Sequence, residues 1–196
     1  GAITRAASAG IIRFNLPSGA QTAGNGFVTT SANTNGILGG WATANVGTTT
    51  NFATVSSGNI IPTTSTAADT ITSWALAQNV TDSAGFTGTL DAETSINSIR
   101  FDANAASAVN LGTGLLIVGS GGILQTSNVA AGTSTISGGR IQSGTGNELI
   151  FITDSATQRL DVSSTMSGAT IVTKNGTGTL RLTGSKIGRA SCRERV

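Results

Sequence analysis

The sequence predicts an all-β protein of the parallel β-helix (β-solenoid) type. Gly, Thr, Ser and Asn make up nearly half of the 196 residues, and only 10% are charged. The Ile, Leu and Val residues come in short clusters separated by glycine-containing turns, a pattern typical of strands joined by tight turns. Some of these clusters recur at offsets of about one short coil, which indicates a repeat architecture.

The last eleven residues, KIGRASCRERV at 186–196, break this composition and are set aside first. They hold four of the eleven basic residues and the single cysteine, Cys192. Back-translation can give a common DNA-sequencing adapter read in frame, so we expect an artefactual tail that does not bear on the fold. Without it the chain carries seven basic and eight acidic groups, and the net charge changes from +2 to −1. We therefore expect no nucleic-acid partner and no thiol chemistry.

The regular part is expected at 95–185, in short runs rich in β-branched residues. The predicted strands are 95–101, 108–111, 115–118, 123–125, 135–137, 140–142, 149–152, 159–162, 170–173 and 179–183. No stretch shows the apolar spacing of an amphipathic helix over ten or more residues. A β-sandwich with evenly spaced strands is the competing architecture.

The first part, 1–94, is predicted to be a less regular, β-rich portion of the same solenoid. Strands are expected near 39–43, 49–54 and 55–61. Another strand is expected at 69–76, with a short helical turn at 74–80 as the alternative. No linker defines a domain boundary, and Gly1 and the missing leader segment suggest an interior piece of a longer reading frame.

Two internal repeats support coils that stack on one another. SGGILQT at 120–126 recurs as SGGRIQS at 137–143, and RLDV at 159–162 matches TLRL at 179–182. The offsets are 17 and 20 residues, which suits one coil of a parallel β-helix. In such a fold each coil covers the apolar residues of the next.

The segment TKNGTGTLRLTG at 173–184 resembles the autotransporter-associated β-strand repeat, a passenger-associated repeat with the pattern KxGxGTLxLxG. The matching positions are Lys174, Gly176, Gly178, Thr179, Leu180, Leu182 and Gly184. The pattern normally continues into an Asn-Thr-Tyr-like segment, which the tail replaces here. Residues 1–5 and 39–43 also look like parts of the large surface proteins that carry this repeat.

This resemblance implies a right-handed parallel β-helix that is exported and displayed on the surface of a Gram-negative-type bacterium. It implies a structural or adhesive passenger segment whose partner is its own C-terminal β-barrel translocator, outside this chain. Surface glycans, or host and neighbouring cells, would be further partners. The ligand and the total number of coils do not follow from the sequence.

Candidate chemistry is sparse, and no enzymatic activity or cofactor is expected. Without His, the chain lacks a Ser-His-Asp or Cys-His arrangement, and no calcium-binding repeat occurs. The eight carboxylates outside the tail are Asp69, Asp82, Asp91, Glu93, Asp102, Glu148, Asp154 and Asp161. We interpret them as turn residues.

Two alternatives remain open at this stage. Asp154 and Asp161, with Arg159 beside them, are the pair to inspect for a β-helical polysaccharide lyase or hydrolase. A phage tail-fibre segment is the other alternative. Phe101 and Phe151 are expected in the core, and Trp41 and Trp74 are expected to be buried unless they stack on sugars.

Overall fold

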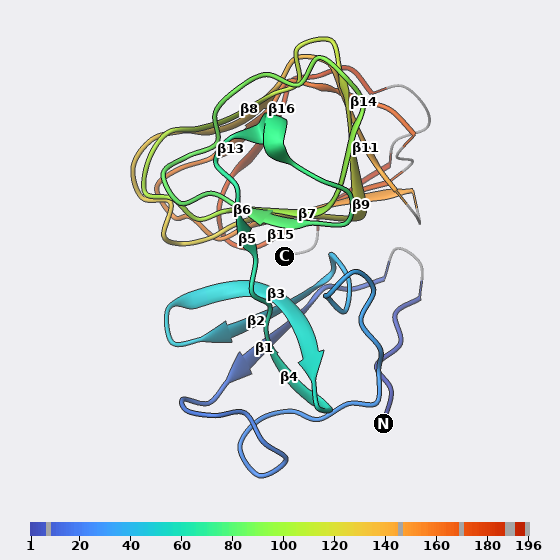
Figure 1. Ribbon diagram of the computed structural model, residues 1–196, viewed down its shortest axis with the longest axis vertical. Helices are drawn as coiled ribbons and strands as arrows, with labels where there is room; N and C mark the ends of the chain where they lie inside the picture. Colours follow the sequence, from blue (N-terminus) through green and yellow to red (C-terminus); the bar gives the residue numbers. More distant parts are fainter. Residues whose placement is uncertain (7–8, 145–146, 169–170, 187–190, 195–196) are drawn as a thin grey trace. The chain divides into compact units, whose positions relative to one another are not determined.

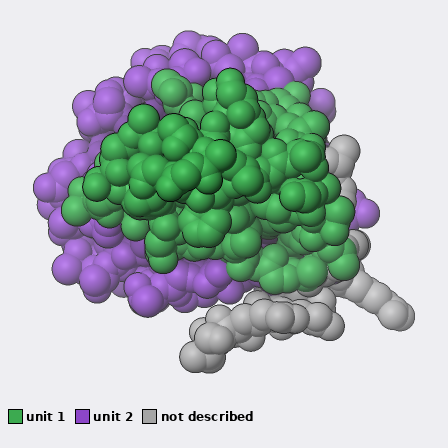
Figure 2. Space-filling model, turned by 90° about the horizontal axis from the view of Figure 1, so that it is seen from below, with its two compact units in different colours: residues 1–64 green, residues 65–196 purple. Residues whose placement is uncertain are grey.

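The computed structural model describes residues 1–6, 9–144, 147–168 and 171–186, and the backbone of 191–194. The chain forms two compact units, unit 1 (Gly1–Thr64) and unit 2 (Ser65–Val196), which are coloured separately in Figure 2. The all-β class is confirmed, because the one helical element described is a 3-10 helix of three residues.

Unit 1 is a four-stranded sheet of mixed direction. Its strands are β1 (Ile12–Leu16), β2 (Ala42–Val46), β3 (Thr49–Ser56) and β4 (Asn59–Pro62), in the spatial order β1-β2-β3-β4. β1 pairs with β2 in parallel, whereas β2–β3 and β3–β4 are antiparallel. Phe14, Leu16, Ala42, Ala44 and Ile60 belong to its apolar cluster, on which Trp41 packs.

Unit 2 consists of parallel strands, drawn from green to red in Figure 1. The strands are β5 (Thr66–Ala67), β6 (Asn79–Thr81), β7 (Thr94–Phe101), β8 (Ser107–Asn110), β9 (Leu115–Gln125), β10 (Ser134–Ser137), β11 (Arg140–Ser143), β12 (Glu148–Thr153), β13 (Leu160–Val162), β14 (Thr165–Met166), β15 (Ile171–Asn175), β16 (Leu180–Leu182) and β17 (Ser191–Glu194). The short 3-10 helix η1 (Ile71–Ser73) lies between β5 and β6.

The chain of unit 2 returns repeatedly to the same ladders, and each such circuit is here called a pass. Within a ladder, each strand pairs with the strand from the next pass. One ladder has the order β8-β10-β13-β16, and a second runs from β5 through β6, β7, β9, β12 and β15 to β17. β11 pairs with both β9 and β14. The single long strand β9 therefore faces two shorter strands, β11 and β12, in the following pass. Every strand pair in these ladders is parallel.

The interior of unit 2 is one apolar cluster with contributions from every full pass. Figure 1 shows the ladders lying around this common interior. Along the strands, alternate side chains point inward, as in Ser134-Thr135-Ile136, where the outer two are buried and Thr135 is partly exposed. Val109, Ile136 and Val162 occupy one register position of the β8-β10-β13 ladder, and all three are fully buried. Stacking of equivalent residues thus covers each pass with the next.

The register confirms one of the two sequence repeats and not the other. Leu160, Asp161 and Val162 pair with Leu180, Arg181 and Leu182, which is the predicted offset of 20. The predicted offset of 17 is wrong as a coil length, because residues 140–143 pair with 115–118 and not with 123–126. The two SGG segments differ in structure, because Gly121 lies within β9 and Gly138 lies between β10 and β11, although both glycines have positive φ.

The strand positions predicted at 95–185 are confirmed within one or two residues, with two changes. The predicted strands 115–118 and 123–125 form one continuous strand, and β14 was missed. Parallel pairing also begins before residue 95, because β5 pairs with β6 and β6 with β7. Residues 69–76 contain η1 and not a strand. In the tail, the backbone of β17 pairs with β15, and residues 187–190 and 195–196 lie outside the described part.

Candidate functional site

The glycines of the segment 174–184 lie where the backbones of two passes approach closely. The motif runs from the end of β15 through a turn into β16 and the residues after it. A Cβ on Gly178 would lie 2.5 Å from the carbonyl oxygen of Ser155, and one on Gly184 would lie 2.0 Å from that of Ser164. Gly176 has φ +86° and would bring a Cβ 2.2 Å from the Thr153 carbonyl oxygen. The backbone of the previous pass therefore excludes side chains at these positions.

Lys174, Leu180 and Leu182 occupy inward register positions of the pass that contains β15 and β16. Lys174 pairs with Phe151 and shares its face of the strand with buried Val172, while its Nζ donates a hydrogen bond to the carbonyl of Gly176 at 2.6 Å. Leu180 and Leu182 pack on the core cluster but are only partly buried. Thr179 is exposed and its carbonyl accepts a hydrogen bond from the Leu160 amide. The motif residues thus have packing and hydrogen-bonding roles.

Asp161 is held between two arginines on the outer side of β13. Its Oδ1 accepts hydrogen bonds from Arg159 Nε at 2.7 Å and Arg181 Nε at 3.0 Å, and its Oδ2 accepts one from Arg181 Nη2 at 2.7 Å. Burial raises the pKa of Asp161, but the hydrogen bonds and charges of the two arginines outweigh it, so the pKa is lowered. An ionised carboxylate engaged with two cations is a poor general acid.

Asp154 and Asp161 lie on different ladders. Asp154 follows β12 at the corner beside Gly176, where its amide donates to the carbonyl of Gln125, whereas Asp161 lies within β13. The two carboxylates that the sequence singled out therefore do not lie on adjacent strands of one ladder, and Asp161 is engaged by Arg159 and Arg181.

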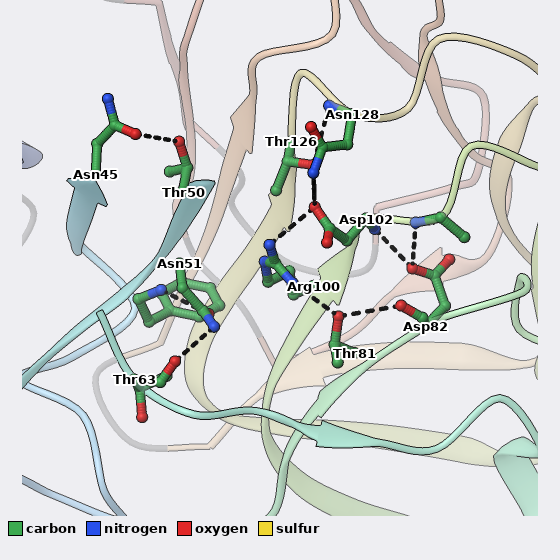
Figure 3. Close-up of polar contacts among 12 residues, drawn as sticks. Asn45, Thr50, Asn51, Thr63, Thr81, Asp82, Arg100, Asp102, Thr126 and Asn128 are labelled. Carbon is green, nitrogen blue, oxygen red and sulfur yellow. Dashed lines mark hydrogen bonds and ion pairs between the residues drawn. The ribbon is translucent and has the colours of Figure 1, made fainter. Parts of the chain in front are cut away.

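Asp82 and Asp102 connect passes at the corner where β6 and β7 end, and sequence reasoning missed this role. Asp82 is buried, and its carboxylate accepts hydrogen bonds from the amides of Asp102 and Ala103 and from the Ser107 hydroxyl, at 2.6–2.8 Å. In Figure 3, Asp102 accepts in turn from Thr126 and Asn128 of the following pass. The sequence signal for this role was an acidic residue directly after each of two successive strands, Asp82 after β6 and Asp102 after β7.

Arg100 completes this corner, where it pairs with Asp102 at 2.8 Å and donates to the Thr81 hydroxyl at 3.2 Å (Figure 3). Burial lowers the pKa of Arg100, and the charges of Asp102 and Asp82 raise it in part. A buried arginine with two carboxylates nearby is satisfied electrostatically. These carboxylates hold the passes together.

The expected burial of Phe101, Phe151 and Trp74 is confirmed, whereas Trp41 is only partly buried. Phe101 and Phe151 are fully buried in the core, and Trp74 is buried with its Nε1 donating to the carbonyl of Ala68. Phe86 makes edge-to-face contacts with both Trp74 and Phe101 at centroid distances of 5.2 and 5.3 Å. In unit 1, Trp41 is partly buried and Phe27 is 45% exposed.

A polar hollow of about 290 Å³ lies beside Arg159. Its lining residues are Thr133, Ser155, Ala156, Thr157, Gln158, Arg159 and Thr179. Thr133, Arg159 and Thr179 come from three successive passes, each directly before a strand of the β10-β13-β16 ladder. Among the described residues, no group of acidic or cysteine side chains could hold a metal ion. No helix within this described part has the length and apolarity needed to cross a bilayer.

Comparison with known proteins gives one match, to the adhesin BmaC autotransporter of Brucella suis biovar 1 (strain 1330). The two sequences are 29% identical over 199 residues. The chain is distantly similar to an autotransporter adhesin. The matched region covers 92% of this chain but only 6% of that adhesin's length. No family model matches the chain, and no solved structure matches it.

Proposed function

We propose that the chain is a structural and adhesive passenger segment of a surface-displayed, autotransporter-like bacterial protein. The similarity to an autotransporter adhesin across 92% of the chain is the observation that carries this proposal. In the complete protein a C-terminal β-barrel translocator would be the partner for export. Glycans or proteins of host or neighbouring cells would be the targets of adhesion.

We further propose that unit 2 is a section of a right-handed parallel β-helix. Parallel ladders, a core stacked by equivalent residues and glycines at the pass-to-pass approaches support this architecture. In such a stack the stability grows with each neighbouring pass, which suits a long, extended stalk. The repeat motif at 174–184 would then be one unit of the stalk.

A structural and adhesive role is also supported by how the carboxylates are used. Asp82 and Asp102 bind amides and hydroxyls of neighbouring passes, and Asp161 is paired with two arginines. Side chains that are engaged in this way stabilise the stack. They are not arranged to transfer protons to a substrate.

Surface display of the complete gene product tests the proposal. An epitope inserted at Gly47–Thr48, an exposed turn between β2 and β3, should be labelled on intact Gram-negative cells. Deletion of the C-terminal third of the complete product should abolish labelling, and deletion of 65–185 should keep labelling but reduce adhesion to host cells. Labelling only after cell lysis would contradict display, and unchanged adhesion would contradict an adhesive role of unit 2.

A further inference from the structure

We propose that the hollow beside Arg159 binds a carboxylated sugar residue of an acidic glycan. This inference rests on the proposed adhesive function, and it names the ligand class and the residues. The size of the hollow, the hydrogen bonds that hold its lining and the charge at its edge support this ligand class.

The size and lining of the hollow suit a single sugar ring. A volume of about 290 Å³ is just below the range of pockets that hold drug-sized ligands. Six of the seven lining residues carry a polar side chain, and Ala156 is the exception. Hydroxyl and amide groups from Thr133, Gln158 and Thr179 can exchange hydrogen bonds with sugar hydroxyls.

The lining loop is held in place by the previous pass. The Ser155 hydroxyl donates to the carbonyl of Val129 and accepts from the amide of Gln158 at 3.0 Å. The Thr157 hydroxyl and the Gln158 side-chain amide both donate to the carbonyl of Ala130, at 3.2 and 3.4 Å. Such preorganisation reduces the entropy that a ligand must otherwise remove from the loop.

The charge at the edge of the hollow favours an anion. Arg159, Asp161 and Arg181 form a cluster with two positive charges and one negative charge. Arg159 is half exposed and uses only Nε for Asp161, which leaves its two terminal amino groups without a partner in the described part of the chain. Asp161 fixes the plane of this guanidinium, and a guanidinium edge is well suited to a carboxylate.

Binding to one hollow should be weak. None of the lining residues is aromatic, so a ring-stacking platform does not contribute. The cluster is exposed, so the attraction between the carboxylate and Arg159 should weaken as salt is added. We therefore expect millimolar dissociation constants, which are measurable by NMR.

The test is a titration of the 196-residue chain, ¹⁵N-labelled, with galacturonic acid and, as the matched neutral sugar, galactose. Galacturonic acid should shift the amides of 155–159 and of Thr133 and Thr179, and galactose should bind at least about tenfold more weakly. Arg159→Gln should raise the dissociation constant about tenfold. Thr179→Val should raise it less, and Arg140→Gln, which removes one exposed positive charge elsewhere in unit 2, should leave it unchanged.

Several outcomes would overturn the proposal. Galactose or acetate would bind as tightly as galacturonic acid, or a short acidic peptide would bind more tightly at the same amides. Alternatively, galacturonic acid would shift only the amides of other residues. If Arg140→Gln lost as much affinity for galacturonic acid as Arg159→Gln, the effect would be one of overall charge and not of the hollow. Unchanged amide shifts outside the hollow would show that Arg159→Gln is folded like the wild type.

Failure of this proposal and failure of the adhesive function can be told apart on cells. Cells that display the complete protein with Arg159→Gln should keep epitope labelling but lose retention on polygalacturonate-coated surfaces. If the wild-type cells bind host cells and not polygalacturonate, the adhesive function stands and the sugar site is wrong. If they bind polygalacturonate and not host cells, the sugar site stands and adhesion to host cells is wrong.

Discussion

Unit 1 and unit 2 are both β-rich, but they build their cores in different ways. Strands β2, β3 and β4 of unit 1 follow one another as antiparallel neighbours, with short turns between them. In unit 2 every strand pairs in parallel with a strand from another pass, at separations from 14 residues (Thr66 with Val80) to 28 (Gly122 with Ile150). Parallel pairing requires such long connections.

Because of this difference, mutations should destabilise the two units in different ways. The apolar cluster of unit 1 depends on a few side chains of one mixed sheet, on which Trp41 packs. In unit 2 the apolar residues of each pass are buried by the neighbouring pass, so a mutation that unfolds one pass exposes the apolar residues of the next. Because unit 1 contains only Trp41 and unit 2 only Trp74, fluorescence can report on the two units separately.

The largest expected effect comes from removing a core ring of unit 2. Phe151→Ala should lower the free energy of unfolding reported by Trp74 by about 3–5 kcal/mol, because a fully buried ring leaves a cavity. Denaturant titration in a Trp41→Phe background measures it. Phe14→Ala is the matched change in unit 1 and should act on the Trp41 signal in a Trp74→Phe background. Equal effects of each mutation on both signals would mean that the units unfold as one.

A smaller effect is expected at the corner between passes. Asp82→Ala should destabilise unit 2 by about 3 kcal/mol, because the amides of Asp102 and Ala103 lose a buried charged acceptor. Asp91→Ala, at an exposed carboxylate with one long contact to the Thr113 amide, should change stability by less than about 0.5 kcal/mol. Urea unfolding followed by Trp74 fluorescence compares the two, and similar losses would contradict the corner role of Asp82.

Replacing a motif glycine with alanine should lower stability by an amount that depends on how closely the backbone of the previous pass approaches that glycine. Gly178→Ala and Gly184→Ala should each cost about 1–3 kcal/mol, since the new methyl group meets a carbonyl oxygen of the previous pass. Gly10→Ala in unit 1 is the control, because nothing lies within 4 Å of its built Cβ and its φ is not positive. Thermal unfolding by circular dichroism is the measurement. A neutral result at Gly184 would mean that the passes separate easily at the end of the stack.

The smallest effect is expected from the exposed arginine pairs and from pH. Arg181→Gln should cost about 0.5 kcal/mol at low salt and less at high salt. The pKa of Asp161 is lowered in the folded state, so its stabilisation is complete above the unfolded value of about 3.9 and is lost as pH falls through the lower folded value. Asp69 should contribute in the same direction, because hydrogen bonds from Ser83 and Ala84 lower its pKa despite the opposing effect of burial.

Denaturant unfolding followed by Trp74 fluorescence at a series of acid pH values measures the pH dependence. The wild-type midpoint should fall more steeply below about pH 4 than that of Asp161→Asn. A parallel decline of the two proteins would contradict the contribution of Asp161.

Much of unit 2 could be predicted from local sequence, because a strand with β-branched residues between glycines is recognisable without its partner. This holds for β7, β10, β12 and β13, and the pairing of 160–162 with 180–182 followed from a repeat. The offset of 17 failed because similar glycine-containing sequences occur at different places in a pass, one within β9 and the other between β10 and β11. The corner carboxylates were missed because their acceptor role depends on amides 20 or more residues away.

Short-range patterns of polar, apolar and glycine residues were enough to predict the all-β class, most strand positions of unit 2 and the burial of Phe101 and Phe151. The register between passes, the start of parallel pairing at β5, and the placement of Asp154 and Asp161 on different ladders depend on contacts between distant residues. The tertiary structure also brought Thr133, Arg159 and Thr179 around one hollow. The physical reason is that connection length between parallel strands varies from pass to pass, so sequence spacing alone does not fix which residues stack.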